Sequence, residues 1–214
     1  MATQPETVRH PLFARVFDRI SRKAEEAGQA EHRQEMLAGL RGRVIEVGAG
    51  NGLNFKHYPD TVEEVIAVEP EAYLRQRAHE SAKTASVPIS VVEGVADRLP
   101  ADDGSVDAAV ASLVLCSVGD QDRALAELQR VLRPGGELRF YEHVVSDKPG
   151  FARFQRIVGH GWPLLAGGCH PDRDTAGAIR RAGFDVEQLR EFDFRPGLLE
   201  LPVTPRILGI ARRV

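Results

Sequence analysis

Arg43-Val44-Ile45-Glu46-Val47-Gly48-Ala49-Gly50-Asn51-Gly52-Leu53-Asn54 is the stretch that decides the fold of this chain. Its first part, from Val44 to Val47, is a short run rich in β-branched residues, which predicts a buried strand. The strand ends in three glycines spaced two apart, Gly48, Gly50 and Gly52. Because glycine has no Cβ, the backbone can turn sharply there and a ligand can approach it closely. This stretch therefore predicts a binding loop at the end of a central strand.

The composition excludes several classes of protein. The chain has 214 residues, a formal net charge of -3 and 43% hydrophobic residues, as expected for one ordinary globular domain without a basic surface for nucleic acid. We expect no membrane segment, because no apolar run approaches the roughly 18–20 residues of a membrane span. The N-terminus lacks the pattern of a signal peptide, so we expect a cytoplasmic protein. Cys116 and Cys169 are too few and too far apart for a disulfide scaffold or a C-x-x-C metal site, and we expect no metal.

Strand-like and helix-like patterns alternate along most of the chain. A loose arm over 1–10 and helices over 11–27 and 30–40 come first, and 146–171 is expected to be irregular. The other predicted helices cover 53–58, 71–84, 120–132 and 172–182, and the predicted strands cover 43–47, 64–68, 89–93, 106–112, 136–143, 184–191 and 206–213. This alternation predicts an α/β fold, a Rossmann-like doubly wound sheet of seven mostly parallel strands. Residues 1–42 would form an N-terminal arm and helical cap, and residues 43–214 the main part of a single structural domain.

The spacing of the glycines separates two kinds of nucleotide site. A dinucleotide fingerprint, G-x-G-x-x-G, requires a glycine where this chain has Leu53. The pattern Glu46-x-Gly48-x-Gly50-x-Gly52 instead resembles motif I of the class I S-adenosylmethionine (SAM)-dependent methyltransferases. The resemblance implies that SAM is the cofactor and S-adenosylhomocysteine the product, and that the loop lies under the amino-acid end of SAM. The loop residues that it implies are Glu46, Gly48, Ala49, Gly50, Asn51, Gly52 and Asn54.

The ends of the next strands carry the rest of the implied cofactor site. Glu69, followed by Pro70, ends the second predicted strand, where a carboxylate can accept hydrogen bonds from both ribose hydroxyls. Many relatives have an aspartate directly after the glycine that follows strand three, whereas this chain has Val95, so Asp97 or backbone groups would contact the adenine. The remaining implied positions are Gly94, Ala96, Ser112, Leu113, Val114 and Ser117. The turn Leu132-Arg133-Pro134-Gly135-Gly136 is a further mark of the family and is expected to end the preceding helix.

Three further segments narrow the resemblance to one subgroup. They are Leu113-Val114-Leu115-Cys116-Ser117-Val118, Glu142-His143-Val144 and Trp162-Pro163-Leu164-Leu165-Ala166-Gly167-Gly168-Cys169-His170. Together they resemble the thiol S-methyltransferases, which methylate alkyl thiols and hydrogen sulfide, and imply a small thiol as the acceptor. Those relatives begin with a hydrophobic membrane anchor, whereas this chain begins with a polar arm, so the resemblance implies no cellular location for this chain.

Two other functions stay open at this point. The first is O-, N- or C-methylation of a natural product, quinone or lipid intermediate, since ubiquinone-type C-methyltransferases share the Leu-Arg-Pro-Gly-Gly turn. The second is a non-catalytic SAM-binding subunit, because a fold does not fix a function. Methylation of nucleic acid is disfavoured by the acidic charge and by Ser112-Leu113-Val114-Leu115, which stands where such enzymes carry an Asn/Asp-Pro-Pro-Tyr/Phe motif. The oligomeric state is left open.

The acceptor side offers several candidate residues. His143, His160 and His170 are candidate bases, because a histidine titrates near neutral pH, and His143 and His170 are the predicted catalytic residues. Cys116 lies in an apolar run and is expected to be buried and inert, whereas Cys169 lies in a turn that could be exposed. We expect an apolar insert with Phe151, Phe154, Leu164 and Leu165 to cover the acceptor, and the N-terminal helix to act as a lid. The predicted substrate pocket comprises Phe13, Phe17, His143, Trp162 and Cys169.

Overall fold

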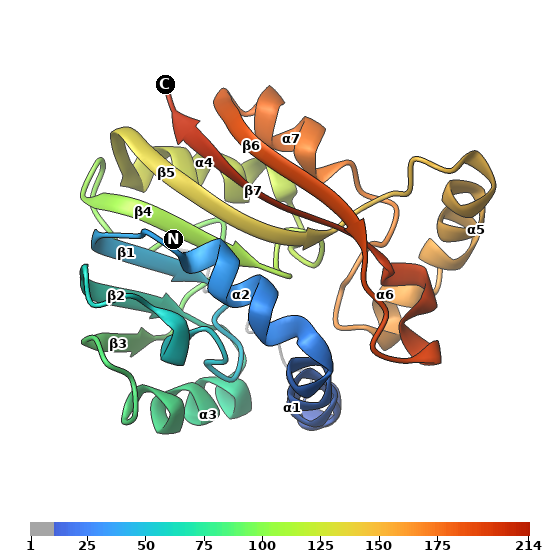
Figure 1. Ribbon diagram of the computed structural model, residues 1–214, viewed down its shortest axis with the longest axis horizontal. Helices are drawn as coiled ribbons and strands as arrows, with labels where there is room; N and C mark the ends of the chain where they lie inside the picture. The colour runs from blue at the N-terminus through green and yellow to red at the C-terminus, as the bar shows by residue number, and fades with distance from the viewer. Residues whose placement is uncertain (1–10) are drawn as a thin grey trace, which may run out of the picture.

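Seven strands form one sheet at the centre of the computed structural model, which describes residues 11–214 (Figure 1). The predicted arm at 1–10 lies outside the described residues. The strands are β1 (Gly42–Val47), β2 (Val62–Val68), β3 (Ile89–Val92), β4 (Val106–Ser112), β5 (Leu132–His143), β6 (Phe184–Asp193) and β7 (Pro205–Arg213). Their order is β3-β2-β1-β4-β5-β7-β6, and β7 runs antiparallel to both β5 and β6. The predicted mostly parallel, Rossmann-like sheet is confirmed.

The order of the strands reverses between β1 and β4. Val44 to Val47 of β1 are buried and pair with β2 on one side and β4 on the other. In open α/β sheets, a ligand binds beyond the carboxyl ends of the strands at this reversal. Figure 1 shows that the arrowheads of the parallel strands point toward the side of the molecule where α1 and α6 lie. The site is therefore to be sought between the strand ends and these helices.

Helices cover both faces of the sheet. One buried cluster contains Leu125 and Leu128 of α4 (Gln121–Val131) and Ile179 of α7 (Thr175–Arg181). A second cluster contains Leu37 of α2 (Ala30–Leu37) and Ala78 of α3 (Ala72–Ala82). Two separate cores of this kind are what a doubly wound sheet requires, because each face must be shielded from water.

Acidic side chains begin three of these helices. Glu71, Asp120 and Asp174 each accept a hydrogen bond from the backbone N–H three residues further on, at the starts of α3, α4 and α7. The Asp120 cap was predicted. Such a cap satisfies an N–H group that has no partner within its own helix. The cap at Asp174 makes α7 start at Thr175, later than the predicted 172.

The N-terminal helices are joined by a kink. Helix α1 (Pro11–Ala24) leads through a π-helical turn, η1 (Glu25–Gln29), into α2. Gly28 in this turn has a φ of 111°, outside helical geometry, which changes the direction of the chain. Helix α2 ends before the predicted residue 40, because Gly39 has a positive φ of 75°. Among residues 11–214, every helix is too short or too polar to span a bilayer.

Three local predictions need correction. The segment 146–171 is not irregular, since it contains α5 (Pro149–Gly159) and α6 (Trp162–Leu165), each with a proline in its first turn, which is compatible with a helix start. The predicted helix 53–58 is only a 3-10 turn, η2 (Phe55–His57). Pro134-Gly135-Gly136 lies within the irregular start of β5, which follows α4 directly and shifts register against β4. A 3-10 segment, η3 (Leu198–Val203), connects β6 to β7.

Candidate active site

The glycine loop after β1 accepts only glycine at two of its positions. Gly48, Gly50 and Gly52 all have positive φ, at 62°, 57° and 77°. A Cβ on Gly48 would lie 2.3 Å from Cγ2 of Val114, and a Cβ on Gly52 would lie 2.7 Å from Cε2 of Phe55. A Cβ on Gly50 would meet only the Phe17 ring, at 3.5 Å. The loop is thus closely packed underneath and faces α1 at Gly50.

Glu69, at the end of β2, holds this loop. Its Oε2 accepts a hydrogen bond from the Gly50 N–H at 2.7 Å, and its Oε1 accepts one from the Glu71 N–H at 2.9 Å. Each carboxylate oxygen has two acceptor positions, so each can accept one more hydrogen bond. The predicted contact with the ribose hydroxyls would use these two remaining positions. Burial raises the pKa of Glu69 to about 6.

Glu46 supports the loop from inside the protein. Its carboxylate is buried and accepts hydrogen bonds from the Tyr58 hydroxyl at 2.7 Å and the Asn54 Nδ2 at 2.8 Å. Burial raises the pKa of Glu46 to about 7. Asn54 Oδ1 in turn accepts a hydrogen bond from Arg33 Nη1 at 2.8 Å, and Arg33 also donates to Ser112 Oγ at 2.9 Å. A single network therefore connects the ends of β1 and β4 to α2.

Sequence reasoning missed the two charged residues at the centre of this network. Arg33 and Glu25 are both buried, and Arg33 Nε donates to Glu25 Oε2 at 3.0 Å. His57 Nε2 lies 3.2 Å and Lys56 Nζ 3.4 Å from the other oxygen of Glu25. The kink at Gly28 brings this pair together. In the sequence, a charged residue within an amphipathic helix gives no indication that its side chain is buried. No local signal could have identified it.

Helix α1 lies over the loop and connects it to the insert. Asp18 Oδ1 accepts a hydrogen bond from Nδ2 of the buried Asn51 at 2.7 Å, and Phe17 lies beside Gly50. Phe13 lies against Gly167 in the insert, so closely that a Cβ there would be 2.2 Å from its Cε1. The centroids of the two phenylalanine rings are 5.8 Å apart. Helix α1 thus contacts both the glycine loop and the insert, and its action as a lid stays a prediction.

The loop after β3 is closely packed at its glycine. A Cβ on Gly94 would lie 2.8 Å from Cγ1 of Val68, the residue before Glu69. Val95 and Ala96 are half-buried, whereas Asp97 is exposed. Pro70, which follows Glu69 at the end of β2, is half-buried, and its carbonyl accepts a hydrogen bond from Arg75 at 2.9 Å. Backbone groups, apolar surface and the exposed acids Glu93 and Asp97 are what this loop offers to a ligand.

The segment after β4 is shaped by Glu142, a residue for which sequence analysis predicted no role in the site. Leu113 has a φ of 58°, which is unusual for a residue with a side chain. Glu142 is fully buried and accepts three backbone hydrogen bonds, from Val114 at 3.0 Å, Leu115 at 2.9 Å and Cys116 at 3.1 Å. Burial raises the pKa of Glu142 above its usual range, while the three N–H groups act in the opposite direction. The carboxylate therefore fixes the course of the segment that includes Ser112 and Ser117.

The two cysteines meet at His143. Cys116 Sγ and Cys169 Sγ are 3.7 Å apart, and each lies 3.5 Å from His143 Nδ1. Cys116 is buried as expected, but Cys169 is also buried, so the expectation that it could be exposed is wrong. Burial lowers the pKa of His143, and the hydrogen bond from Cys169 together with burial raises that of Cys116 above its usual range. Residues that are 53 positions apart in sequence thus form one cluster.

Trp162 packs against this cluster, and the other two histidines do not extend it. The indole Nε1 of Trp162 is buried and has no hydrogen-bond partner among the described residues. The backbone N–H of His170 donates to the carbonyl of Cys116 at 2.8 Å, and burial and Arg173 lower the pKa of its ring. His160 is exposed at the end of α5, where its Nδ1 lies 2.8 Å from the carbonyl of Arg156. Of the three candidate bases, His143 is the one whose ring faces the cysteines.

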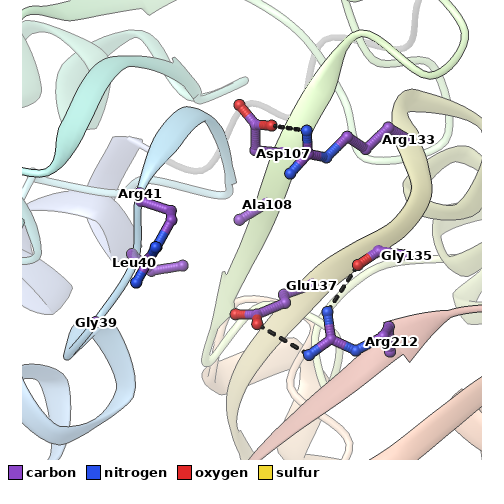
Figure 2. A pocket seen from close by; sticks show the side chains of 9 residues that line it. All are labelled: Gly39, Leu40, Arg41, Asp107, Ala108, Arg133, Gly135, Glu137 and Arg212. Carbon is purple, nitrogen blue, oxygen red and sulfur yellow. Dashed lines mark hydrogen bonds and ion pairs between the residues drawn. The ribbon is translucent and has the colours of Figure 1, made fainter.

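A cavity of about 270 Å³ lies elsewhere, at the amino ends of β1 and β4 (Figure 2). Figure 2 shows two ion pairs beside it, Arg133 with Asp107 at 2.9 Å and Arg212 with Glu137 at 3.1 Å. Its other lining residues are Gly39, Leu40, Arg41, Ala108 and Gly135. Because ligands of this fold bind at the opposite, carboxyl ends of the strands, we assign no part of the site to it.

Comparison with known proteins agrees with this geometry. Residues 45–140 match the family described as methyltransferase domain. Human thiol S-methyltransferase TMT1A is 38% identical over 82% of this chain and 73% of its own length. Thiol S-methyltransferase TMT1B of Mus musculus is 36% identical over 94% of this chain and 84% of its own. A solved structure from Thermotoga maritima is of a SAM-dependent methyltransferase described as a possible histamine N-methyltransferase. It has a TM-score of 0.68 and is 21% identical, and the match covers 94% of this chain and 98% of its own. At this identity the similarity shows the fold alone.

Proposed function

The chain belongs to the class I SAM-dependent methyltransferases and acts on a small molecule, and we propose that its acceptor is a thiol, which it converts into a methyl thioether. The observation that carries the proposal is the extent of the similarity to thiol S-methyltransferases. It continues beyond residues 45–140, which this chain shares with methyltransferase domains in general, and so includes parts of the chain outside the common cofactor-binding half.

The residues around the glycine loop fit SAM, which supplies a methyl group on a positively charged sulfur. Gly48, Ala49, Gly50, Asn51 and Gly52 would line the amino-acid end, and Glu69 with Pro70 would hold the ribose. The adenine would lie against the backbone of Gly94, Val95, Ala96 and Asp97. The segment containing Ser112, Leu113, Val114 and Ser117 would lie near the reacting methyl, with Glu46 and Asn54 supporting the loop. The paired free acceptor positions on Glu69 are the main support for this assignment.

The acceptor side favours a nucleophile that needs little chemical help. Phe13, Phe17 and Trp162 would enclose the acceptor beside His143 and Cys169, with α1 acting as a lid that excludes water. Alignment of a nucleophile with a methyl group can supply much of the rate enhancement of a displacement reaction. A thiol, with a pKa near ~8.5, already provides some thiolate at neutral pH, whereas an alcohol needs a strong base. The half-buried His143 beside two thiols is not a strong base, which suits a thiol acceptor better than an alcohol.

The acceptor class can be tested by measuring S-adenosylhomocysteine release with hydrogen sulfide, an alkyl thiol, an aryl thiol, a phenol and a quinol. We expect turnover with the thiols and none with the phenol or the quinol. Turnover of the phenol or quinol alone would contradict the thiol proposal and leave the family unchanged. Binding of SAM without turnover of any compound would favour a dedicated biosynthetic substrate or a non-catalytic subunit instead.

Binding of SAM should depend on pH through Glu69. Because burial raises the pKa of Glu69 from 4.5 to about 6, the stability that the protonated carboxyl contributes is fully present below about pH 4.5 and is lost as the pH rises through about 6. Hydroxyl groups bind the charged carboxylate more strongly, so cofactor affinity should change in the opposite direction. We expect the dissociation constant of SAM, measured by calorimetry, to fall about tenfold between about pH 5 and about pH 7. In Glu69→Gln this dependence should disappear, and its persistence would assign the titration to another group.

A further inference from the structure

Cys116, His143 and Cys169 present three metal-binding atoms from three separate elements. Cys116 follows β4, His143 ends β5, and Cys169 lies in the turn after α6. The three edges of the triangle formed by the two Sγ atoms and Nδ1 measure 3.7, 3.5 and 3.5 Å. The fold brings together a pair of soft sulfur donors and one imidazole nitrogen in a buried position.

This triangle has the dimensions of one face of a zinc tetrahedron. Zinc lies about 2.3 Å from cysteine sulfur and about 2.0–2.1 Å from histidine nitrogen. With tetrahedral angles, these bond lengths place two sulfurs about 3.8 Å apart and a sulfur and a nitrogen about 3.5–3.6 Å apart. All three observed edges agree with these separations to within about 0.1 Å. A zinc ion could therefore bind without large movement of the donor atoms.

The charges and the surroundings also fit a divalent ion. Two thiolates and a neutral imidazole carry a charge that balances that of Zn²⁺, so the site would hold no net charge until the acceptor thiolate binds. The backbone of Cys116 is fixed on both sides, since its N–H donates to Glu142 and its carbonyl accepts from His170, the residue after Cys169. These two hydrogen bonds hold the backbones of Cys116 and Cys169 in a common position.

The fourth position of the tetrahedron has a candidate occupant. Three protein donors leave one position open, as in catalytic zinc sites and unlike closed structural sites. Trp162 packs against the two cysteines, and its buried indole N–H lacks a partner among the residues of the described chain. A ligand with a sulfur atom at the open position would provide an acceptor for such a donor. The same segment, 112–117, includes both Cys116 and the residues assigned to the reacting end of SAM.

We propose that Cys116, His143 and Cys169 bind a zinc ion whose fourth ligand is the acceptor thiol, an inference that rests on the proposed thiol S-methylation. Coordination makes the thiol lose its proton to solvent, because a zinc-bound thiol is deprotonated. The thiolate lone pair then forms a bond to the SAM methyl carbon, and the electrons of the broken carbon–sulfur bond remain on S-adenosylhomocysteine. A thiol and SAM thus give a methyl thioether, S-adenosylhomocysteine and one proton, and the neutral thioether leaves the zinc. His143 is in this account a zinc ligand and not a base.

Metal binding can be measured independently of turnover. The full chain, purified without a metal-binding tag, is titrated with Zn²⁺ against a chromophoric chelator and with Co²⁺ by absorption spectroscopy. We expect one ion per chain and, with Co²⁺, the charge-transfer absorption of cobalt–thiolate bonds. Cys116→Ser and Cys169→Ser should each weaken Zn²⁺ binding by more than about 100-fold, because each removes a direct ligand and the loss of an outer-shell partner already costs up to about 100-fold. His79→Gln, which changes an exposed histidine on α3, is the control and should bind zinc as the unmodified chain does.

Two further readouts separate the possible failures. Calorimetry with SAM tests whether each cysteine variant still has a folded cofactor site, and we expect cofactor affinity within about twofold of the unmodified chain. Zinc binding that is weak, or equal in the unmodified chain and both cysteine variants, would overturn the zinc site. Thiol methylation that continues at full rate after exhaustive chelation would also overturn it and leave the proposed function standing. Tight zinc binding in an enzyme that methylates only phenols would instead overturn the proposal that the acceptor thiol is the fourth zinc ligand.

Discussion

Glu69→Ala will weaken the binding of SAM by about 100-fold or more and leave the protein folded. The carboxylate is buried, and in the proposed site each of its two oxygens would accept a hydrogen bond from a ribose hydroxyl; hydrogen bonds to charged groups contribute about 1.5–3 kcal/mol each. The variant also removes the acceptor for the Gly50 N–H and so loosens the loop itself. Calorimetric titration with SAM measures the loss directly.

The folded state should tolerate this change. Burial raises the pKa of Glu69, so its charge is costly in the free protein at neutral pH, and removal of the charge offsets part of the lost hydrogen bonding. Glu93→Ala is the matched control, because Glu93 is an exposed acid after the neighbouring strand β3. Its affinity for SAM should be unchanged. Equal affinities of the unmodified chain and Glu69→Ala would defeat the assignment of the cofactor site.

Glu142→Ala will lower the free energy of unfolding by about 3–5 kcal/mol and abolish turnover. The substitution leaves three buried N–H groups, of Val114, Leu115 and Cys116, without an acceptor, and an unpaired buried donor costs about 1–3 kcal/mol. Turnover should be lost because the backbone of Leu113, with its positive φ, and of the residues after it can no longer keep its conformation. Denaturant unfolding measures the first effect, and S-adenosylhomocysteine release measures the second.

Two variants make this result specific to the three hydrogen bonds. Glu142→Gln keeps one acceptor oxygen, which can serve Val114 and Leu115, so its loss of stability should be smaller than that of Glu142→Ala. Glu191→Ala changes an exposed acid on β6 and should alter stability by no more than about 0.5 kcal/mol. If Glu142→Ala were as stable as Glu191→Ala, Glu142 would have no role in holding the segment after β4.

The sheet and the glycine loop were predictable because their signals are local. The run from Val44 to Val47 and the glycines that follow it specify a buried strand and a tight loop within a dozen residues. Glu69 was predictable for the same reason, since it directly follows an apolar strand. The helices of 149–159 and 162–165 were missed, although the prolines of this segment lie in first turns, where a helix tolerates them.

The buried polar network and the cysteine cluster could not be predicted from the sequence. Arg33 meets Ser112 across 79 positions, and Cys116 meets Cys169 across 53. Such contacts depend on how the helical cap and the insert dock on the sheet, which no short pattern encodes. Sequence spacing alone argued against a metal site. The structure brings the three donor atoms of the proposed zinc site together from β5 and two loops, a juxtaposition that sequence spacing does not show.

Thiol S-methylation can be tested in a single reaction in which a thiol and a hydroxyl compete within one acceptor. The enzyme is supplied with SAM that carries an isotope-labelled methyl group and with 4-mercaptophenol, and the labelled product is identified by NMR. We expect the label only on sulfur, as the S-methyl thioether. Label on oxygen, or no transfer from bound SAM, would contradict thiol S-methylation.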